Sequence, residues 1–134
     1  MAIIKPDGVS QGLIGEVIRR LEANDFRILN LKMVRLSRQE AEGFYAIHRE
    51  RPFFQSLTAF MCEGPIVVLL LEAEEAIQRL RALMGATDPA KADTGTIRRD
   101  FGSSVERNVI HGSDSSASAQ FEIGFFFDES KNSR

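Results

Sequence analysis

The stretch Ile66-Val67-Val68-Leu69-Leu70-Leu71 decides the fold, because it is an unbroken apolar run that begins directly after Gly64-Pro65. An apolar run of this length between turn signals is typical of a strand that is covered on both faces of a sheet. The sequence therefore predicts a central strand over residues 66–71, and the other elements can be placed relative to it.

The N-terminal part of the chain predicts two further strands and a helix. Ala2 to Ile4 is apolar and stops at Lys5-Pro6-Asp7-Gly8, a turn sequence in which proline lacks a donor and glycine permits the bend. Residues 14–21 carry apolar side chains at helical spacing, and residues 29–33 alternate apolar with polar side chains. The chain is therefore expected to open as β-α-β, with Lys5 at the end of a strand.

Three helices are predicted around the central strand. Ser37 followed by Glu40 is a capping-box pattern, and it opens a helix that carries Tyr45 on its apolar face. Residues 52–61 begin with a proline, which suits the first turn of a helix, and residues 74–84 form another helical segment.

The C-terminal part predicts a long loop, a short strand and a last helix. Residues 85–101 are rich in Thr, Asp, Pro and Gly, and we expect this long loop to be functional. Val109-Ile110 predicts a strand that ends at His111-Gly112, after which Ser113 or Asp114 caps a helix running through Ile123. Residues 129–134 are predicted to form a frayed tail.

Together these elements predict an α+β protein. Their order, βαββαβ with additional helices and the long loop near residues 85–101, is that of a ferredoxin-like sandwich, in which helices cover one face of an antiparallel sheet. The 134 residues, 43% hydrophobic and 27% charged, predict one domain over residues 1–134.

The composition also excludes several classes of protein. The lone Cys62 cannot form an intrachain disulfide, no apolar run can span a bilayer, and no cleavable leader precedes Ile3, so we expect a cytoplasmic protein without membrane association. A net charge of -2 argues against nucleic-acid binding. Two histidines and one cysteine are too few for a zinc site, so any metal is expected to be Mg²⁺ that a phosphate substrate brings.

Phosphate binding, if present, must rely on side chains, since neither of the common glycine-rich phosphate loops occurs. Most surface lysines and arginines are only solvated or weakly paired. Arg81 has an isoleucine rather than a carboxylate four residues before it, which favours a binding role. For Arg98, an ion pair with Asp100 explains the pattern as well as phosphate binding does. The candidate cations and donors are Lys5, Arg81, Thr87, Arg98 and Asn108.

Two aromatic positions have competing interpretations. Tyr45 shares an apolar face with Phe44, so the pattern alone favours a core tyrosine whose hydroxyl finds a partner at the rim. Phe53 and Phe54 lie about 100° apart on a helix and cannot both point into the core. One of them can serve as an exposed stacking platform, although solitary exposed aromatics are also common.

His111 is the most informative position, because it lies at the end of an apolar strand, where a side chain is expected to be exposed. The pattern alone leaves three roles open, ranked as a structural residue, a general base and a nucleophile. Glu122 can orient the imidazole, directly or through Ser113, as the third group of a triad does. The alternative is that Glu122 is an ordinary glutamate on a helix surface.

Six segments resemble nucleoside diphosphate kinase in order and spacing across almost the whole chain, and the His-Gly-Ser-Asp-Ser run is the most specific of them. They are Ile3-Ile4-Lys5-Pro6-Asp7-Gly8-Val9, Arg51-Pro52-Phe53-Phe54, Gly64-Pro65, Gly85-Ala86-Thr87-Asp88-Pro89-Ala90, Gly95-Thr96-Ile97-Arg98 and Asn108-Val109-Ile110-His111-Gly112-Ser113-Asp114-Ser115. The resemblance implies a ferredoxin-like fold and reversible transfer of the γ-phosphoryl group of a nucleoside triphosphate, usually ATP, to a nucleoside diphosphate. It also implies a phosphohistidine intermediate, ping-pong kinetics and a requirement for Mg²⁺.

The resemblance assigns a role to each candidate residue by position. His111 would be the nucleophile, and Phe53 would stack on the base opposite Val105. Stacking tolerates every base, so broad specificity is expected. The implied catalytic group is His111, Lys5, Tyr45, Asn108, Ser113 and Glu122. The implied nucleotide-binding group is Lys5, Phe53, Arg81, Thr87, Arg98, Val105 and Asn108, with no metal ligand of the protein's own beyond the nucleotide phosphates.

The resemblance further implies a homo-oligomer, and both a tetramer and a hexamer fit the sequence. The start of the first strand is shorter than is common in the family, which bears on the stability of that edge of the sheet. The chain also stops soon after Phe127, without the longer tail of eukaryotic relatives, which indicates a bacterial-type protein. Asp88 and Ser116-Ala117 depart from frequent residues of the family without removing a catalytic side chain. The main rival is a family member whose catalysis is lost or incidental and which acts as a regulatory or nucleic-acid-binding module. The intact His111 and its cations argue against it.

Overall fold

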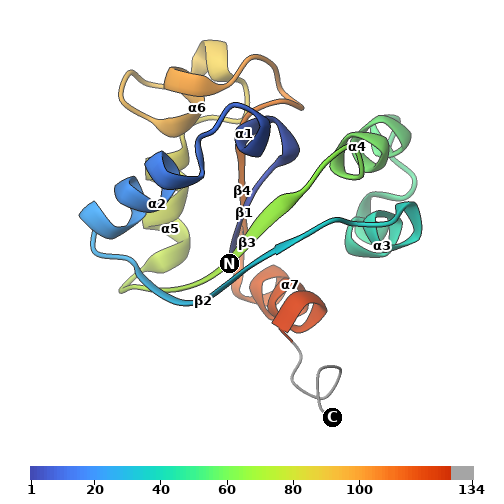
Figure 1. The fold of residues 1–134 in the computed structure, drawn as a ribbon, viewed down its shortest axis with the longest axis horizontal. Helices are drawn as coiled ribbons and strands as arrows, with labels where there is room; N and C mark the ends of the chain where they lie inside the picture. Colours follow the sequence, from blue (N-terminus) through green and yellow to red (C-terminus); the bar gives the residue numbers. More distant parts are fainter. Residues whose placement is uncertain (128–134) are drawn as a thin grey trace.

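The computed structural model describes residues 1–127, so the predicted tail at 129–134 lies outside the described residues. Figure 1 shows strands crossing the middle of the molecule with helices on either side. The elements in chain order are β1 Ala2–Ile4, α1 Pro6–Ser10, α2 Ile14–Ala23, β2 Arg27–Val34, α3 Arg38–Phe44, the 3₁₀ turn η1 Ala46–His48, α4 Phe54–Met61, β3 Ile66–Glu72, α5 Ala76–Met84, the 3₁₀ turn η2 Pro89–Lys91, α6 Ile97–Phe101, β4 Ile110–Gly112 and α7 Ser116–Phe127.

The four strands form one antiparallel sheet in the order β2-β3-β1-β4. Ile3 of β1 lies between Val68 of β3 and His111 of β4, so the register places His111 on an edge strand beside the buried centre of the sheet. The predicted central strand is β3, and the antiparallel α+β fold of the prediction is confirmed.

Helices cover both faces of the sheet, which corrects the expectation that they cover one. Ile3, Ile66 and Val68 face α3, α4 and α7, whereas Ile4 and Val67 face α2, α5 and α6. The reason is that successive side chains of a strand point to opposite faces, and β1 and most of β3 are apolar at successive positions. Both faces therefore require a hydrophobic cover.

Local differences from the predicted elements follow from capping residues. The segment expected as a turn at Pro6 begins the short helix α1, because a proline also suits the first helical position. Tyr45 is the C-cap of α3 and Phe53 is the N-cap of α4, so both lie at helix ends rather than within the helices. Helix α5 begins at Ala76, since Glu75 adopts a left-handed conformation with φ of 49°.

The expected long loop at residues 85–101 contains two short elements. Asp88 accepts a hydrogen bond from the Ala90 amide at the start of η2, and Thr96 accepts one from the Arg99 amide at the start of α6. The last helix is capped by Ser115, whose hydroxyl accepts from the Ser118 amide, rather than by Ser113 or Asp114. Within residues 1–127 the helices are all too short or too polar to cross a membrane.

Candidate active site

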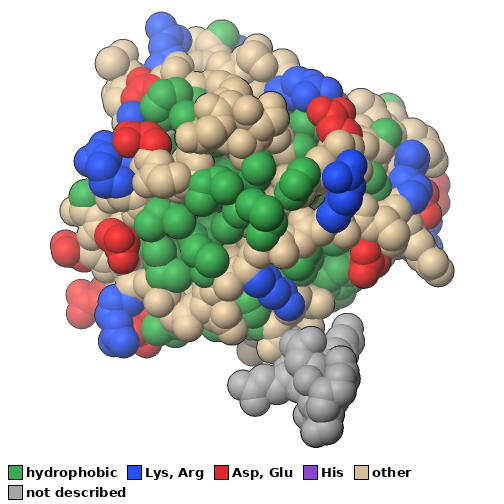
Figure 2. Space-filling view, in the orientation of Figure 1, with side chains coloured by type: hydrophobic (Ala, Val, Ile, Leu, Met, Phe, Trp, Pro, Cys, Tyr) green, Lys and Arg blue, Asp and Glu red, His purple; other side chains and the backbone are tan. Residues whose placement is uncertain are grey.

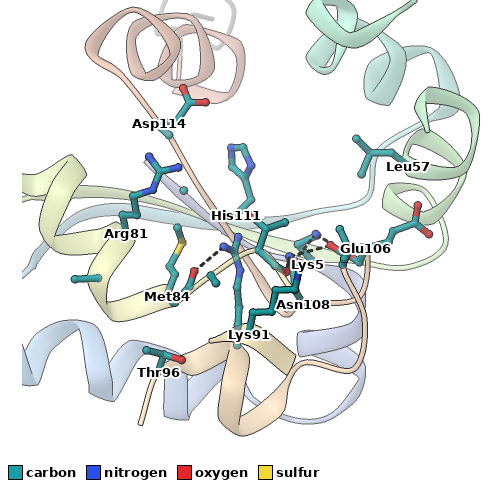
Figure 3. A pocket seen from close by; sticks show the side chains of 18 of the residues that line it. Lys5, Leu57, Arg81, Met84, Lys91, Thr96, Glu106, Asn108, His111 and Asp114 are labelled. Atoms are coloured by element: carbon teal, nitrogen blue, oxygen red, sulfur yellow. Dashed lines mark hydrogen bonds between the residues drawn. The ribbon is translucent and has the colours of Figure 1, made fainter. Parts of the chain in front are cut away.

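A cavity of about 770 Å³ opens where the ends of β1, β4, α4 and α5 meet the segment 85–108. Figure 3 shows side chains from these elements converging on it, with His111 near its centre. All of the predicted site residues line this cavity except Glu122, which lies behind His111. The predicted residues in the lining are Lys5, Tyr45, Phe53, Arg81, Thr87, Arg98, Val105, Asn108, His111 and Ser113.

Glu122 of α7, which lies outside the cavity lining, contacts the imidazole of His111. Its Nε2 atom lies 2.9 Å from Glu122 Oε1, and the Ser113 hydroxyl donates to the same oxygen at 2.7 Å. Glu122 is 9% exposed, so it is not a helix-surface glutamate. Because a carboxylate only accepts, Nε2 carries the ring proton, and the lone pair of the neutral ring lies on Nδ1. Of the two predicted arrangements, in which Glu122 orients His111 directly or through Ser113, the structure contains the direct contact.

The position of His111 depends on a strained turn directly before it. Val109 has a φ of 76°, and the Ile110 amide donates to the carbonyl of Asn108 across a three-residue turn. Asp7 accepts from the Val109 amide at 3.0 Å, and the Lys5 amide donates to the Val109 carbonyl at 2.8 Å. Asp7 and Lys5 thus fix the turn that aims β4 at the cavity.

Asp7 itself is a buried carboxyl group. Its Oδ1 atom has no hydrogen-bond partner among the described residues, while Oδ2 holds Val109. Burial raises the pKa of Asp7, whereas the charge of Lys5 and the backbone hydrogen bonds lower it. Asp7 was not among the residues predicted for the site, although its place beside Lys5 at a strand end was an available signal.

Lys5 is 6% exposed and is bound by groups of the 106–108 segment. Its Nζ donates to the Glu106 carbonyl at 2.8 Å and to Asn108 Oδ1 at 2.7 Å. Burial lowers the pKa of Lys5 to about 8; the charge of Arg98 lowers it further, and Asp7 opposes the shift. A lysine in this state gains strongly from an anionic ligand, because the ligand charge compensates for lost hydration.

The side-chain amide of Asn108 forms three hydrogen bonds within the site. Its Nδ2 donates at 2.9 Å to the carbonyls of Thr87 and Val105, while Oδ1 accepts from Lys5. These bonds connect three segments that line the cavity. Both Nδ2 protons of Asn108 are therefore in use, whereas Oδ1 keeps one lone pair that can accept from a ligand hydroxyl. In this structure Asn108 positions Lys5, Thr87 and Val105.

Two arginines also contribute to the cationic part of the cavity. Arg98 donates to the carbonyls of Gly85 at 3.0 Å and Ile110 at 2.7 Å, and its buried Nε has no partner among residues 1–127. Burial and then the charge of Arg81 lower the pKa of Arg98 to about 10. The alternative of an Arg98 ion pair with Asp100 is wrong, because Asp100 binds Arg20 at 2.9 Å.

Arg81 extends from α5 into the cavity in Figure 3. No described residue forms a hydrogen bond or an ion pair with its side chain. A cation that the fold leaves without a partner beside a second cation is suited to an anion with several negative oxygens.

The opposite end of the cavity is apolar and aromatic. Phe53 is 46% exposed and Val105 56% exposed, whereas Phe54 is buried, so Phe53 is the available platform. Ring contacts continue from Phe53 to His48 at 5.5 Å, from His48 to Tyr45 at 6.5 Å and from Tyr45 to His111 at 6.4 Å, measured between centroids. Tyr45 is buried in this row, and burial together with the charge of Glu122 raises its pKa.

A model of the family "Nucleoside diphosphate kinase" matches residues 1–132 of the chain. The chain belongs to the nucleoside diphosphate kinase family. The nucleoside diphosphate kinase of Desulfosudis oleivorans is 61% identical over 127 residues, which cover 95% of this chain and 91% of the relative. The family resemblance predicted from the six motifs is thereby confirmed.

Solved structures of nucleoside diphosphate kinases have the same fold. The enzyme of Aquifex aeolicus superposes with a TM-score of 0.92 at 45% identity, over 94% of this chain and 92% of that one. The enzyme of Halobacterium salinarum, solved in complex with CDP, gives a TM-score of 0.91 at 40% identity, over 95% and 85% of the two chains. The ferredoxin-like fold predicted from the sequence is confirmed.

In this nucleoside diphosphate kinase family member, the cavity lining also contains residues that sequence reasoning missed. Lys91 lies in the same long segment as Thr87 and Arg98, and that shared segment was the available signal. Asp93 and Thr96 lie in this segment too, and Glu106 and Asp114 directly follow the predicted residues Val105 and Ser113. His48 comes from a different part of the chain and reaches the cavity through the fold. The missed lining residues with polar or aromatic groups are His48, Lys91, Asp93, Thr96, Glu106 and Asp114.

Residues 1–127 contain no group of three or more His, Cys, Asp or Glu side chains that could hold a metal ion. The cavity instead combines cations with the separate carboxylates of Asp93, Glu106 and Asp114. This donor set fits a Mg²⁺ ion that is bound mainly by phosphate oxygens and water, as is usual for Mg²⁺ with nucleotides.

Proposed function

We propose that this chain is a working nucleoside diphosphate kinase that carries the γ-phosphoryl group on Nδ1 of His111. The observation that supports this most directly is the contact between Nε2 and Glu122, which leaves Nδ1 as the nucleophilic atom in a cationic cavity. In a cell this activity would equilibrate nucleoside di- and triphosphate pools, and we propose the cytoplasm as its location.

In the first half-reaction the Nδ1 lone pair of His111 attacks the γ-phosphorus of a nucleoside triphosphate. The bond from that phosphorus to the β–γ bridging oxygen breaks, and the nucleoside diphosphate leaves with the electron pair. The ring gains positive charge, which the Glu122 carboxylate stabilises through Nε2–H. A second nucleoside diphosphate then takes the phosphoryl group by the reverse steps, so donor and acceptor use one site in turn.

The cations of the cavity would stabilise the transferring group. Lys5, Arg81 and Arg98 lie around the cavity on three different segments, and phosphoryl transfer depends mainly on positioning and on charge neutralisation. We propose that Thr87 binds a phosphate or ribose oxygen, and that Asn108 acts by fixing Lys5 and Thr87. Tyr45 would support the transfer site beside His111, since its ring contacts that imidazole.

The aromatic end of the cavity would bind the base. We propose that the base stacks on Phe53 and is bounded on its other side by Val105, both of which are exposed. A stacking site of this kind accepts purines and pyrimidines, because each base offers a π-face. The CDP complex of the Halobacterium salinarum relative agrees with a nucleoside diphosphate as ligand.

Mg²⁺ would enter with the nucleotide. When bound with the nucleotide, the ion would supply charge neutralisation to the phosphate groups. Asp93 and Asp114 are lining carboxylates able to bind its water ligands.

We also propose that the protein is a homo-oligomer and that β2 takes part in the contact. This strand is the edge of the sheet, and it exposes three apolar side chains on consecutive alternate positions, Leu29, Leu31 and Met33. Figure 2 shows hydrophobic side chains gathered across the middle of this face. An apolar edge strand without a cover invites pairing, and a second copy of this chain would satisfy it.

The test is to incubate the purified protein and a His111→Ala variant with γ-labelled ATP and Mg²⁺, and then to add GDP. Acid-labile label on the parent alone, followed by its appearance in GTP, would support the phosphohistidine. A folded parent that binds ATP but takes no label would contradict it and leave a binding module.

A further inference from the structure

The base end of the cavity is a slot between two segments that lie about fifty residues apart in the chain. One wall is the start of α4 with Phe53 and Leu57, and the other is the turn 103–107 with Val105 and Glu106. Figure 3 shows Leu57 and Glu106 at the α4 end of the cavity. We call the space between these walls the base slot.

A side-chain hydrogen bond joins the two walls on their solvent-exposed side, with Ser56 outside the cavity lining. The hydroxyl of Ser56 donates to Glu106 Oε2 at 2.8 Å. Ser56 lies three residues after Phe53, a spacing that brings side chains to one side of a helix, and Glu106 directly follows Val105. Each partner of this bond is thus close to a residue that would contact the base: Ser56 is one helical turn from Phe53, and Glu106 is next to Val105 in the sequence.

A second connection holds the same turn at its far end. Arg107 forms a two-pronged ion pair with Glu63, at 2.9 Å for each contact, and its guanidinium lies 4.7 Å from the Phe60 ring centroid. The amides of Ser103 and Ser104 both donate to the Arg107 carbonyl, which closes the turn on itself. The backbone of the turn is thus held at Arg107 and also through the carbonyls of Val105 and Glu106, which accept from Asn108 and Lys5. The Ser56 bond adds a link between the Glu106 side chain and α4.

We propose that Ser56 and Glu106 form a latch that fixes the width of the base slot, which makes them positioning residues for the base of every nucleotide. This inference rests on the proposed function. If the slot already has the correct width before the nucleotide binds, its walls lose little conformational entropy on binding, and the affinity is higher. The latch should therefore act on nucleotide affinity and leave phosphoryl transfer at His111 unchanged.

A different role for Glu106 makes different predictions. If the Glu106 carboxylate bound the amino group of a base directly, removing it would weaken the binding of nucleotides whose base carries an amino group at that place. The binding of the other nucleotides would not change. Removing the Ser56 hydroxyl would then have no effect. A latch predicts equal effects from both partners on all bases, because the wall spacing is common to all of them.

The experiment compares Ser56→Ala, Glu106→Ala and the double variant for steady-state kinetics with GDP, CDP and UDP and for equilibrium binding of the same nucleotides. We expect each single variant to raise KM and Kd about threefold, the range of one exposed hydrogen bond, with kcat unchanged. The double variant should be no worse than either single variant. Ser56→Thr keeps a hydroxyl and should restore parental values.

Ser10→Ala and Glu22→Ala are matched controls on exposed residues away from the slot, and thermal unfolding of each variant shows that the fold is kept. Additive effects in the double variant, a base-selective effect of Glu106→Ala alone, or no effect of Ser56→Ala would each overturn the latch. If the parent forms no phosphohistidine, the proposed function fails, while the binding arm still decides whether the latch exists.

Discussion

Glu122 Oε1 lies 2.9 Å from His111 Nε2 and also accepts the hydroxyl of Ser113, so one carboxylate oxygen fixes both the tautomer and the orientation of the imidazole. The carboxylate is buried, and its charge acts on the ring with little screening by water. The cationic ring that forms when Nδ1 is phosphorylated should depend on this charge.

Glu122→Gln keeps the size of the side chain and an acceptor oxygen but removes the negative charge. We expect the rate of His111 phosphorylation to fall about a hundredfold, the order that a positioned acid–base partner contributes. Rapid-quench measurement of the labelled protein gives this rate. Ser113→Ala retains the carboxylate and should lower the rate less than about tenfold; equal losses in the two variants would argue that packing, rather than charge, is what matters.

Lys5 should make nucleotide binding dependent on pH. Because its pKa is lowered to about 8, the cation is present below that pH and is lost above it. We expect KM for a nucleoside diphosphate to rise as the pH increases from about 7 to about 9. In Lys5→Met, KM should be about tenfold to a hundredfold higher at neutral pH and lack this rise, and a parental rise persisting in the variant would refute the assignment.

Lys5 should also make the free energy of unfolding depend on pH, and here an increase in pH is favourable. In the unfolded chain Lys5 keeps its ordinary pKa, so between pH 8 and about 10.5 the unfolded state binds more protons than the folded one. The contribution of Lys5 to the free energy of unfolding should therefore increase with pH across this window. Denaturant unfolding at the two ends of the window, compared between the parent and Lys5→Met, measures it.

Arg81 should matter for the ligand-bound protein and hardly at all for the free one. It has no hydrogen-bond or ion-pair partner among the described residues, so Arg81→Gln should change the free energy of unfolding by less than about 0.5 kcal/mol. A nucleoside diphosphate at about a hundred times its Kd should raise the parental melting temperature by about 10 °C. The variant should lose most of that rise at the same ligand concentration.

Arg98→Gln is the informative comparison for this prediction. That variant loses the bonds to Gly85 and Ile110 and should be less stable even without ligand. Scanning calorimetry of the two variants with and without ADP separates the two roles. A large ligand-induced rise retained in Arg81→Gln would mean that Arg81 does not bind the phosphates.

The edge strand β2 supplies a test of assembly. Leu31→Glu places a charge in the middle of the exposed apolar row, and we expect a smaller oligomer or a monomer by light scattering coupled to gel filtration. Ile47→Glu is the matched control, since Ile47 is 89% exposed but lies in η1, away from the strand. Identical masses for the parent and Leu31→Glu would exclude β2 from the contact.

The strands at 2–4 and 66–71 could be predicted from the sequence because their apolar pattern is local and complete. Helix α6 could not, since five residues capped by Thr96 are too short to show a helical period. The chemical types at the site, a histidine at a strand end and dispersed cations, were also visible in the sequence. Their partners were not, because Asp7 meets Val109, and Asp100 meets Arg20, only through contacts between distant segments.

Gly85 should affect both the stability of the fold and the position of Arg98 in the site. It adopts a φ of 89°, and a Cβ there would lie 2.5 Å from Thr96 Oγ1 and 2.7 Å from Thr96 Cβ. Gly85→Ala should therefore lower the free energy of unfolding by about 3 kcal/mol, from backbone strain and overpacking together. Because the Gly85 carbonyl also accepts from Arg98, the variant should bind nucleoside diphosphates more weakly as well.

Gly15→Ala provides the control, because Gly15 lies in α2 and a Cβ added there would have open space around it. Alanine there should stabilise the protein by about 0.5 to 1 kcal/mol and leave binding unchanged. Denaturant unfolding and nucleotide titration of both variants test the contrast. If Gly85→Ala unfolded more easily but bound nucleotide as the parent does, Arg98 would not need the Gly85 carbonyl to hold its place in the cavity.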